Sequence, residues 1–368
     1  MNTAKTVCVD CCNAELIRTR ADTLVLFLTS NKLGPKCAAH KNGKSNMKKR
    51  KLGNSGLEVA PLALGGNVFG WTIDEPASFQ VLDAFLAAGF NFVDTADMYS
   101  IWKPGNKGGE SETIIGNWMK KSANRQKVLV ATKVGMDLGA GMKGLSKDYI
   151  FRAAEASLRR LQTDYIDLYQ AHTDDATVPL QETLEAFGQL VKQGKVRAIG
   201  ASNYTAPRLS EALDVSKKRG LTRYESLQPL YNLYDRADYE AALEPVCRKN
   251  GIGVIPYYSL ASGFLTGKYR GEGDLAKSAR GAGVKKYLNE RGFRILAALD
   301  QTAKKYNSTP AKVSLAWLLT RPTITAPIAS ATNVAQLREL VDATNLNLDR
   351  ESVQLLDQAS APSFSAAT

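Results

Sequence analysis

The clearest structural signal in this chain is the stretch Asn91-Phe92-Val93-Asp94-Thr95-Ala96-Asp97-Met98-Tyr99, in which a short apolar run ends in a carboxylate. Amphipathic helical patterns flank the stretch near residues 77–88 and 111–121. Short apolar runs that alternate with amphipathic helices are typical of a parallel sheet whose strands are joined by crossover helices. The stretch is therefore predicted to be one strand of a repeating strand and helix unit.

The same unit can be counted eight times along the chain. Strands are predicted near residues 59–65, 91–96, 128–134, 165–171, 196–201, 225–229, 252–257 and 323–329. Helices are predicted near residues 77–88, 111–121, 147–161, 180–193, 206–219, 238–249, 290–306 and 333–343. Eight such pairs predict an α/β fold of the (β/α)8 type, a TIM barrel of parallel strands with outer helices. Active sites of this fold form at the C-terminal ends of the strands.

A doubly wound parallel sheet is the alternative fold. Such a sheet leads with a Gly-x-Gly-x-x-Gly turn directly after its first strand and before a helix. Residues 65–70 read Gly-Gly-Asn-Val-Phe-Gly, which has neither that spacing nor a helical pattern directly behind it. The barrel is therefore favoured.

The excess positive charge is concentrated near the start of the chain. The chain has 368 residues, 44% of them hydrophobic, and a formal net charge of +12. The first 50 residues hold ten basic and three acidic side chains, so they carry +7 and the remaining 318 residues carry +5. Because no basic patch interleaved with aromatic residues occurs in the remainder, nucleic-acid binding is not expected.

A regular pattern begins at Met47 and divides the chain into three parts. Residues 1–46 are expected to be an unstructured extension, residues 47–360 the barrel, and residues 361–368 a C-terminal tail. Ligand chemistry suited to a structural zinc ion offers an alternative for the extension. The four side chains concerned are Cys8, Cys11, Cys37 and His40.

Cysteine usage and hydropathy point to a protein of the cytoplasm. Cys247 is the only cysteine outside the extension, so no disulfide framework is implied. The longest apolar run near the start, Leu24 to Leu28, is too short to span a bilayer. A membrane association is therefore not expected, and no metal is expected in the barrel.

Polar side chains stand at three successive predicted strand ends. Asp94 ends the second strand, and Tyr99 follows five residues later. Lys133 ends the third strand, and His172 ends the fourth. Because the ends of barrel strands meet at one mouth, these four side chains are predicted to form one catalytic group.

Together the four side chains suit the reduction of a carbonyl by hydride, which requires a proton at the carbonyl oxygen. Tyrosine, with a pKa of about 10, is a weak acid at neutral pH. We expect the Lys133 ammonium to lower the pKa of Tyr99, and the Asp94 carboxylate to keep Lys133 charged. His172 is expected to donate a hydrogen bond to the substrate oxygen.

From about residue 51 to residue 359 the chain resembles the aldo-keto reductase superfamily. The resemblance rests on seven ordered motifs: Asp94-Thr95-Ala96-x2-Tyr99, Gly108-Gly109-Glu110-Ser111-Glu112-x2-Ile115-Gly116, Thr132-Lys133, Asp164-Tyr165-Ile166-Asp167-Leu168-Tyr169-Gln170-x-His172, Gly194-Lys195-Val196-Arg197-x-Ile199-Gly200-x-Ser202-Asn203, Gln228-x2-Tyr231-Asn232-Leu233 and Gly263-x-Leu265-Thr266-Gly267-Lys268. The resemblance implies that Tyr99 is the general acid and that His172 orients the carbonyl. It also implies a nicotinamide cofactor held across the barrel mouth.

The resemblance further implies three groups of cofactor contacts. Ser202, Asn203 and Gln228 would bind the nicotinamide amide, and Tyr257 would stack on its ring. The segment from Ser259 to Lys268 would wrap the pyrophosphate, with Ser259, Leu260, Gly263, Leu265 and Lys268 as its contacts. Ser330, Thr332 and Gln336 would bind the adenosine end, beside a helix N-terminus that suits phosphate.

The adenosine segment departs from the family pattern, because relatives often place a basic residue near Ser330 or Thr332 and the chain has none there. NADP(H) is the expected cofactor, with Arg338 or Arg280 replacing the missing cation, and NAD(H) is the alternative. Trp71 and Trp102 are predicted to wall an apolar substrate pocket for a small aldehyde or ketone, and packing at the barrel bottom or rim is the alternative for Trp71. The loop 269–289 is expected to be a mobile belt over the cofactor, or else a solvated linker.

Barrels of this family can also serve as regulatory subunits that hold cofactor with little turnover. An intact group of four side chains favours an enzyme, namely an NADP-dependent carbonyl reductase or alcohol dehydrogenase. The sequence leaves open the natural substrate, the physiological direction of the reaction and the oligomeric state.

Overall fold

The computed structural model describes residues 47–362. The predicted extension 1–46, its zinc hypothesis and residues 363–368 of the predicted tail lie outside the described residues. Within the described part, no helix is long and apolar enough to cross a membrane. No group of three His, Cys, Asp or Glu side chains in this part is arranged to hold a metal ion.

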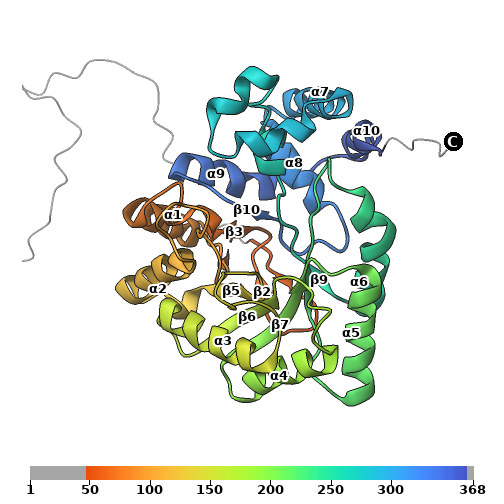
Figure 1. The fold of residues 1–368 in the computed structure, drawn as a ribbon. Helices are drawn as coiled ribbons and strands as arrows, with labels where there is room; N and C mark the ends of the chain where they lie inside the picture. Colours follow the sequence, from red (N-terminus) through yellow and green to blue (C-terminus); the bar gives the residue numbers. More distant parts are fainter. Residues whose placement is uncertain (1–46, 363–368) are drawn as a thin grey trace, which may run out of the picture. The chain divides into compact units, whose positions relative to one another are not determined.

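Eight parallel strands curl into a barrel, which confirms the predicted (β/α)8 fold (Figure 1). Their order is β10-β3-β4-β5-β6-β7-β8-β9. Their bounds are β3 Ala63–Gly65, β4 Phe92–Asp94, β5 Leu129–Val134, β6 Ile166–Ala171, β7 Val196–Ser202, β8 Ser226–Gln228, β9 Gly253–Val254 and β10 Ile328–Ala329. Backbone hydrogen bonds close the ring, because Thr325 N donates to Val254 O at 2.8 Å and Ile328 N donates to Pro256 O at 2.9 Å.

Helices cover the outside of the barrel (Figure 1). Their bounds are α1 Glu75–Ala87, α2 Glu110–Ser122, α3 Lys147–Leu161, α4 Leu180–Lys192, α5 Ala206–Arg219, α6 Glu244–Asn250, α7 Glu290–Lys305, α8 Pro310–Leu319, α9 Val334–Asp342 and α10 Arg350–Ser360. Several begin at a side-chain cap, as where Asp74 accepts from Ala77 N and Asn289 accepts from Gly292 N. Such caps satisfy amide groups that the first helical turn leaves free.

Proline accounts for several differences from the predicted boundaries, because it has no N–H to donate. The run predicted as one strand over 59–65 is broken at Pro61, so that β2 (Glu58–Val59) precedes β3. The predicted strands 252–257 and 323–329 shrink to β9 and β10, beside Pro256 and Pro327. The predicted helix 238–249 starts as a π-turn over η3 (Tyr239–Leu243), and Pro245 follows it.

Two helices were not predicted from the sequence. Helix α8 is buried nearly all round, with Val313, Leu315 and Trp317 among its buried residues, so it shows no amphipathic pattern. Helix α10 comes after the eighth unit and lies beyond the repeat. The segment 269–289, expected to be a mobile belt or a linker, contains two short 3-10 helices, η5 (Glu272–Lys277) and η6 (Gly281–Tyr287).

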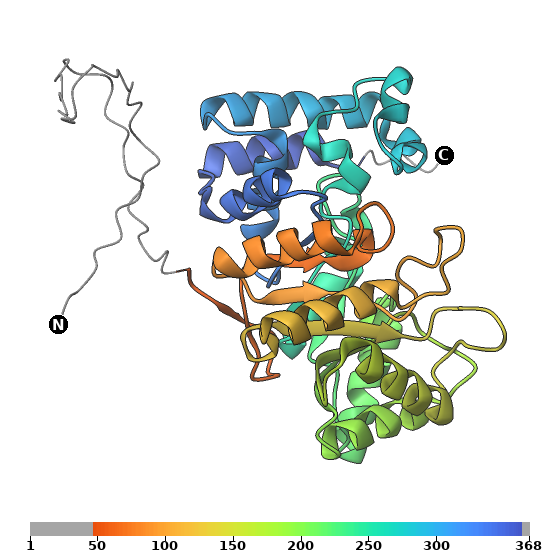
Figure 2. The same cartoon turned by 90° about the vertical axis from the view of Figure 1, so that its left-hand side faces the viewer.

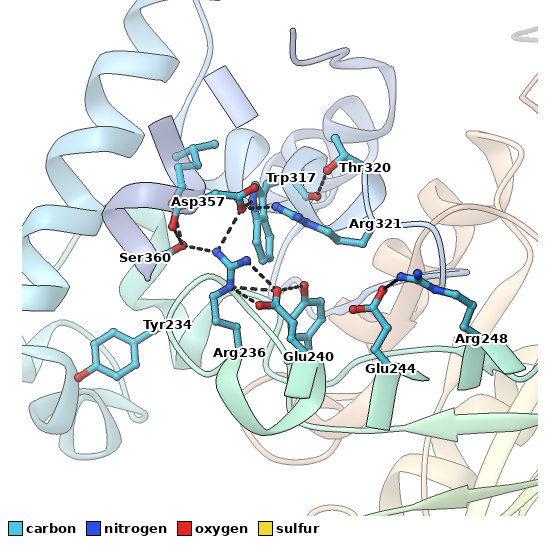
Figure 3. Close-up of polar contacts among 12 residues, drawn as sticks. Tyr234, Arg236, Glu240, Glu244, Arg248, Trp317, Thr320, Arg321, Asp357 and Ser360 are labelled. Carbon is cyan, nitrogen blue, oxygen red and sulfur yellow. Dashed lines mark hydrogen bonds and ion pairs between the residues drawn. The ribbon is translucent and has the colours of Figure 1, made fainter. Parts of the chain in front are cut away.

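A charged cluster fastens α10 to the rest of the domain (Figure 3). Arg236 Nη1 donates to Asp357 Oδ1 at 3.1 Å and to Ser360 Oγ at 2.7 Å. Arg321 pairs with the same oxygen of Asp357, and Trp317 Nε1 donates to it at 2.9 Å. Both guanidinium groups also lie over the Trp317 ring, at 4.9 and 4.1 Å from its centroid.

A short hairpin closes the N-terminal end of the barrel. Strand β1 (Arg50–Lys51) pairs antiparallel with β2. Leu52 and Leu57, between the two strands, share a core cluster with Phe92 at the start of β4 and Leu168 within β6. The hairpin lies at one end of the domain, and the loops that follow β4 and β5 project from the other (Figure 2). The barrel is thus open toward solvent at its C-terminal mouth.

Candidate active site

The four side chains predicted to form one group lie at the C-terminal mouth of the barrel. Lys133 Nζ donates to Asp94 Oδ2 at 2.9 Å, to Tyr99 OH at 2.9 Å and to Thr95 O at 2.7 Å. Tyr99 OH donates to Asp94 Oδ2 at 3.2 Å. The His172 ring lies edge-on to the Tyr99 ring, with 6.0 Å between centroids. One hydrogen-bonded group therefore joins β4, its following loop and β5, with His172 beside it.

Asp94 is the shared acceptor of this group. Gln228, at the end of β8, donates from Nε2 to Asp94 Oδ1 at 2.9 Å. Asp94 and Lys133 are both buried, with 1% and 0% of their side chains exposed. A buried ion pair requires further hydrogen bonds to offset its desolvation, and Thr95, Tyr99 and Gln228 provide them here.

Burial sets the protonation states of the group. It raises the pKa of Tyr99 well above its usual 10.0, and the adjacent Asp94 carboxylate raises that pKa further. The sequence analysis expected Lys133 to lower the pKa of Tyr99, whereas in this structure burial and the Asp94 carboxylate, which accepts the hydrogen bond of the phenol, raise it. Burial also lowers the pKa of Lys133, although Asp94 opposes that shift. Burial, followed by the charge of Lys133, lowers the pKa of His172 well below 6.5. Tyr99 and His172 are thus both neutral at neutral pH.

A cavity of about 870 Å³ lies above the group. Asp94, Tyr99 and His172 line its floor, whereas Lys133 lies behind the wall and reaches the cavity only through them. Among residues 47–362, no group hydrogen-bonds to the buried Nδ1 of His172. A cavity of this size, with a few convergent polar groups, suits a small organic ligand or a cofactor.

The residues expected to contact the nicotinamide line this cavity and bond to one another. Ser202 Oγ donates to Gln228 O at 2.9 Å, and Asn203 Nδ2 donates to His172 O at 2.8 Å. Tyr257 OH donates to Asn203 Oδ1 at 2.8 Å, which leaves the Tyr257 ring half-buried at the cavity wall. These bonds hold polar groups from four neighbouring strand ends, β6 to β9, in fixed positions.

Most residues expected at the phosphate and adenosine ends also line the cavity. They are Ser259, Leu260, Gly263, Lys268, Ser330, Thr332 and Gln336. Leu265 does not line it, because its side chain packs in the hydrophobic core. At the adenosine end Gln336 Oε1 accepts from Thr332 N and Oγ1, both at 2.9 Å.

Three cations line the cavity from the segment beyond β9, namely Lys268, Lys277 and Arg280. Arg280 lies over the Trp71 ring, 5.5 Å from its centroid. The buried Arg280 Nη2 has no hydrogen-bond partner within the described part of the chain. Arg338, the other candidate cation, is exposed on α9 and does not line the cavity.

Aromatic and thioether side chains form the outer wall. Trp102 lines the cavity, and its ring centroid lies 5.9 Å from that of Tyr99. Trp71 lies outside the lining and packs edge-on against Trp102 at 5.5 Å. The sequence interpretation missed Met136 and Tyr258, which also line the cavity. Both follow predicted strands within two residues, so the strand-end rule could have found them.

The comparisons with known proteins agree on one family. The model of the Aldo/keto reductase family matches residues 61–361. An uncharacterized oxidoreductase, YrpG, of Bacillus subtilis is 37% identical, over 83% of this chain and 94% of its own length. Protein tas of Escherichia coli is 32% identical, over 83% of this chain and 95% of its own length. Aldo-keto reductase AFTS1 of Alternaria alternata is 34% identical, over 84% of this chain and 91% of its own length.

Proposed function

This chain belongs to the aldo/keto reductase family, and from that premise we propose that it reduces aldehydes or ketones to alcohols with NADPH. Tyr99 is the general acid in this proposal. The observation that carries it is the hydrogen-bonded group of Tyr99, Lys133 and Asp94 at the floor of a cavity that His172 also lines.

The cavity residues fit a nicotinamide cofactor. Ser202, Asn203 and Gln228 offer amide and hydroxyl groups at one end, where Tyr257 offers a flat ring. Lys268, in the segment expected to wrap the pyrophosphate, suits a phosphate of the cofactor. When bound, the reduced nicotinamide would supply the hydride that reduces the carbonyl carbon.

The protein's own task is then to hold and protonate the carbonyl oxygen. Neutral His172 can donate a hydrogen bond to this oxygen and direct it toward Tyr99 OH. Tyr99 gives its proton to the oxygen as negative charge develops there. The Lys133 ammonium, 2.9 Å away, stabilises the resulting phenolate, and Asp94 balances the charge of Lys133.

NADP(H) is proposed over NAD(H) because three cations line the cavity from the segment beyond β9. Arg280 is the proposed partner of the extra phosphate, since Arg338 lies outside the lining. NAD(H) is the alternative cofactor. Gln336 and Glu339 of α9 line the adenosine end of the cavity, and no cation of α9 lines it there to bind a 2′-phosphate.

The test is turnover of NADPH with a panel of aromatic and aliphatic aldehydes and ketones. Tyr99→Phe is expected to lower kcat by about 10²- to 10⁴-fold, because phenylalanine has no proton to give. Cofactor affinity, measured by quenching of tryptophan fluorescence, should be retained. The matched control is Tyr165→Phe, whose hydroxyl contacts Gln126 at 3.5 Å on the outside of the barrel. Full activity of Tyr99→Phe would refute the assignment, and tight cofactor binding with no turnover by wild type would favour a regulatory subunit.

A further inference from the structure

Asp97 is a buried carboxyl that the proposed reaction does not use. It lies two residues before Tyr99, and its backbone N donates to Lys133 O at 3.2 Å, so the loop continues to pair along β5. Side chains along this paired segment alternate between its two faces. Asp94 faces the cavity, whereas the Thr95 hydroxyl bonds to Ser111 of α2 at 2.8 Å. Asp97 is two residues after Thr95, so its side chain lies on the same face of the segment and points toward the helices outside the barrel wall.

The Asp97 side chain is shielded from water, and among the described residues only the backbone N–H of Met98 approaches its carboxyl group. Only 2% of the residue is exposed. Neither carboxyl oxygen has a hydrogen-bond partner among residues 47–362. An ionised carboxylate in such surroundings costs several kcal/mol, so a buried carboxyl without partners is expected to keep its proton.

Among the described residues, no cationic side chain forms an ion pair with Asp97. Glu112 of α2 is fully buried and accepts from Thr132 Oγ1 at 2.5 Å and from Arg160 Nε at 2.6 Å. The Arg160 guanidinium is therefore committed to Glu112. It also packs against Gly109, where an added Cβ would lie 2.4 Å from Arg160 Cδ.

The remaining groups that face Asp97 are Lys133 of β5 and the phenols of Tyr149 and Tyr169. All the polar contacts of Lys133 go to Asp94, Thr95 and Tyr99, on the other face of the wall. Burial, followed by the charge of Glu112, raises the pKa of Asp97 to about 8, against opposing contributions from Arg160, the backbone N–H of Met98 and Lys133. The geometry and the charges agree that this carboxyl is neutral at neutral pH.

We propose that Asp97 is a positioning residue that carries a proton in the active enzyme, and that loss of this proton displaces Tyr99 and shuts down turnover under alkaline conditions. The inference rests on the proposed function, because it assigns the alkaline limit of activity to a residue outside the cavity.

The physical reason is that an ionised Asp97 cannot stay where it is. The carboxylate must turn toward water or toward Arg160, and the backbone of Met98 and Tyr99 must follow. Tyr99 OH is held at 2.9 Å from Lys133 and 3.2 Å from Asp94. A displacement of about 1 Å at a catalytic group can cost about 100-fold in rate. The added negative charge would also oppose formation of a phenolate at Tyr99.

The first experiment does not depend on turnover. Between the usual pKa of 3.8 and the folded pKa of about 8, the folded protein holds a proton that the unfolded chain has lost. Stability of the wild type therefore falls as pH rises through this window and is lowest above it. Asp97→Asn cannot ionise. The melting temperature of the variant minus that of wild type should therefore increase by at least about 3 °C between about pH 5 and about pH 9. Parallel melting curves would overturn the proposal.

The second experiment measures kcat of saturated enzyme against pH. Wild type is expected to lose activity with a single ionisation near pH 8, about tenfold for each further pH unit. Asp97→Asn should keep its activity through the same range. The matched control is Asp137→Asn, an exposed carboxylate whose side chain is 59% accessible on the loop after β5 and which should leave the profile unchanged. An unchanged alkaline limb in Asp97→Asn would overturn the proposal. Absence of turnover at every pH would instead refute the proposed function, and the melting experiment would still decide the protonation of Asp97.

A second variant guards against a fold defect in the first. Glu112→Gln removes the neighbouring negative charge and frees Arg160, both of which favour ionisation of Asp97. The alkaline limb should therefore move to lower pH, opposite to the loss expected for Asp97→Asn. A shift to higher pH, or no shift, would contradict the proposal.

Discussion

At the scale of single residues, the site depends on one carboxylate. Asp94 accepts from Lys133, Tyr99 and Gln228, which come from β5, the loop after β4, and β8. Because the pair of Asp94 and Lys133 is buried, each charge depends on the other. A change at either residue is expected to affect stability as well as chemistry.

Lys133→Met should reveal this dependence. The variant leaves the Asp94 carboxylate buried without its cation, so we expect a loss of about 3 kcal/mol in the free energy of unfolding in urea, with an activity loss of at least about 100-fold. The matched control is Lys312→Met, which removes a surface pair with Asp342 at 3.1 Å and should cost less than about 1 kcal/mol. Equal losses for the two variants would contradict the dependence.

Those residues of the candidate site that lie at strand ends could be predicted from the sequence. Asp94 ends β4, Lys133 is the last residue but one of β5 and His172 follows β6, and parallel strands bring their ends to one mouth. Leu265 was misplaced and Met136 was missed because both belong to the connections between strands and helices, whose path is set by tertiary packing. The burial that raises the pKa of Tyr99 could not be predicted either, since it comes from segments far apart in the chain.

At the scale of elements, helices with one apolar face were predicted well, and α3 and α5 have the predicted bounds. Short strands between prolines were overextended, because an apolar run does not show where hydrogen bonding stops. The buried helix α8 has no polar face to reveal its period. The hairpin at the closed end was also missed, since each of its strands spans two residues.

Two glycines of the hairpin region offer a matched test of how it docks. Gly53 and Gly56 both have positive φ, at +56° and +76°. An added Cβ at Gly53 would lie 2.2 Å from Glu225 O, whereas at Gly56 it would meet nothing within 4 Å in the described structure. Gly56→Ala should cost about 1 kcal/mol from strain alone, and Gly53→Ala at least about 1 kcal/mol more. Urea unfolding measures both, and equal costs would mean that the hairpin adjusts freely.

Removal of Asp357 should loosen α10. Asp357→Asn weakens the contacts with Arg236 and Arg321 and leaves two partly buried guanidinium groups over Trp317 (Figure 3). We expect a loss of about 2 kcal/mol in the free energy of unfolding, and unchanged turnover in the folded enzyme because α10 does not line the cavity. A large fall in kcat without a fall in stability would show that α10 acts on the site.

At the scale of the whole molecule, the cavity joins the barrel mouth to later segments. Its lining runs from Gly65 at the end of β3 to Leu340 on α9, and it includes the segment from Lys277 to Arg280. A cofactor bound there would contact parts of the fold that are far apart in sequence. Binding to the folded state alone would therefore stabilise the entire domain.

NADPH is accordingly expected to raise the melting temperature more than NADH does. At a hundredfold excess over its Kd, a ligand adds about 2.7 kcal/mol to the free energy of unfolding. Arg280→Met should reduce the NADPH shift and leave the NADH shift nearly unchanged, if Arg280 contacts the extra phosphate. Equal shifts for the two cofactors, in wild type and variant alike, would refute the proposed preference.

The floor and the outer wall of the cavity are built differently. Hydrogen bonds between strand ends fix the floor, whereas Trp102, Met136 and Tyr258 of the outer wall stand on loops. The wall can therefore be redesigned while the proposed proton donor, Tyr99, stays in place. A library varied at these three positions would explore new substrates above an unchanged cavity floor, which makes this barrel a practical starting point for directed evolution.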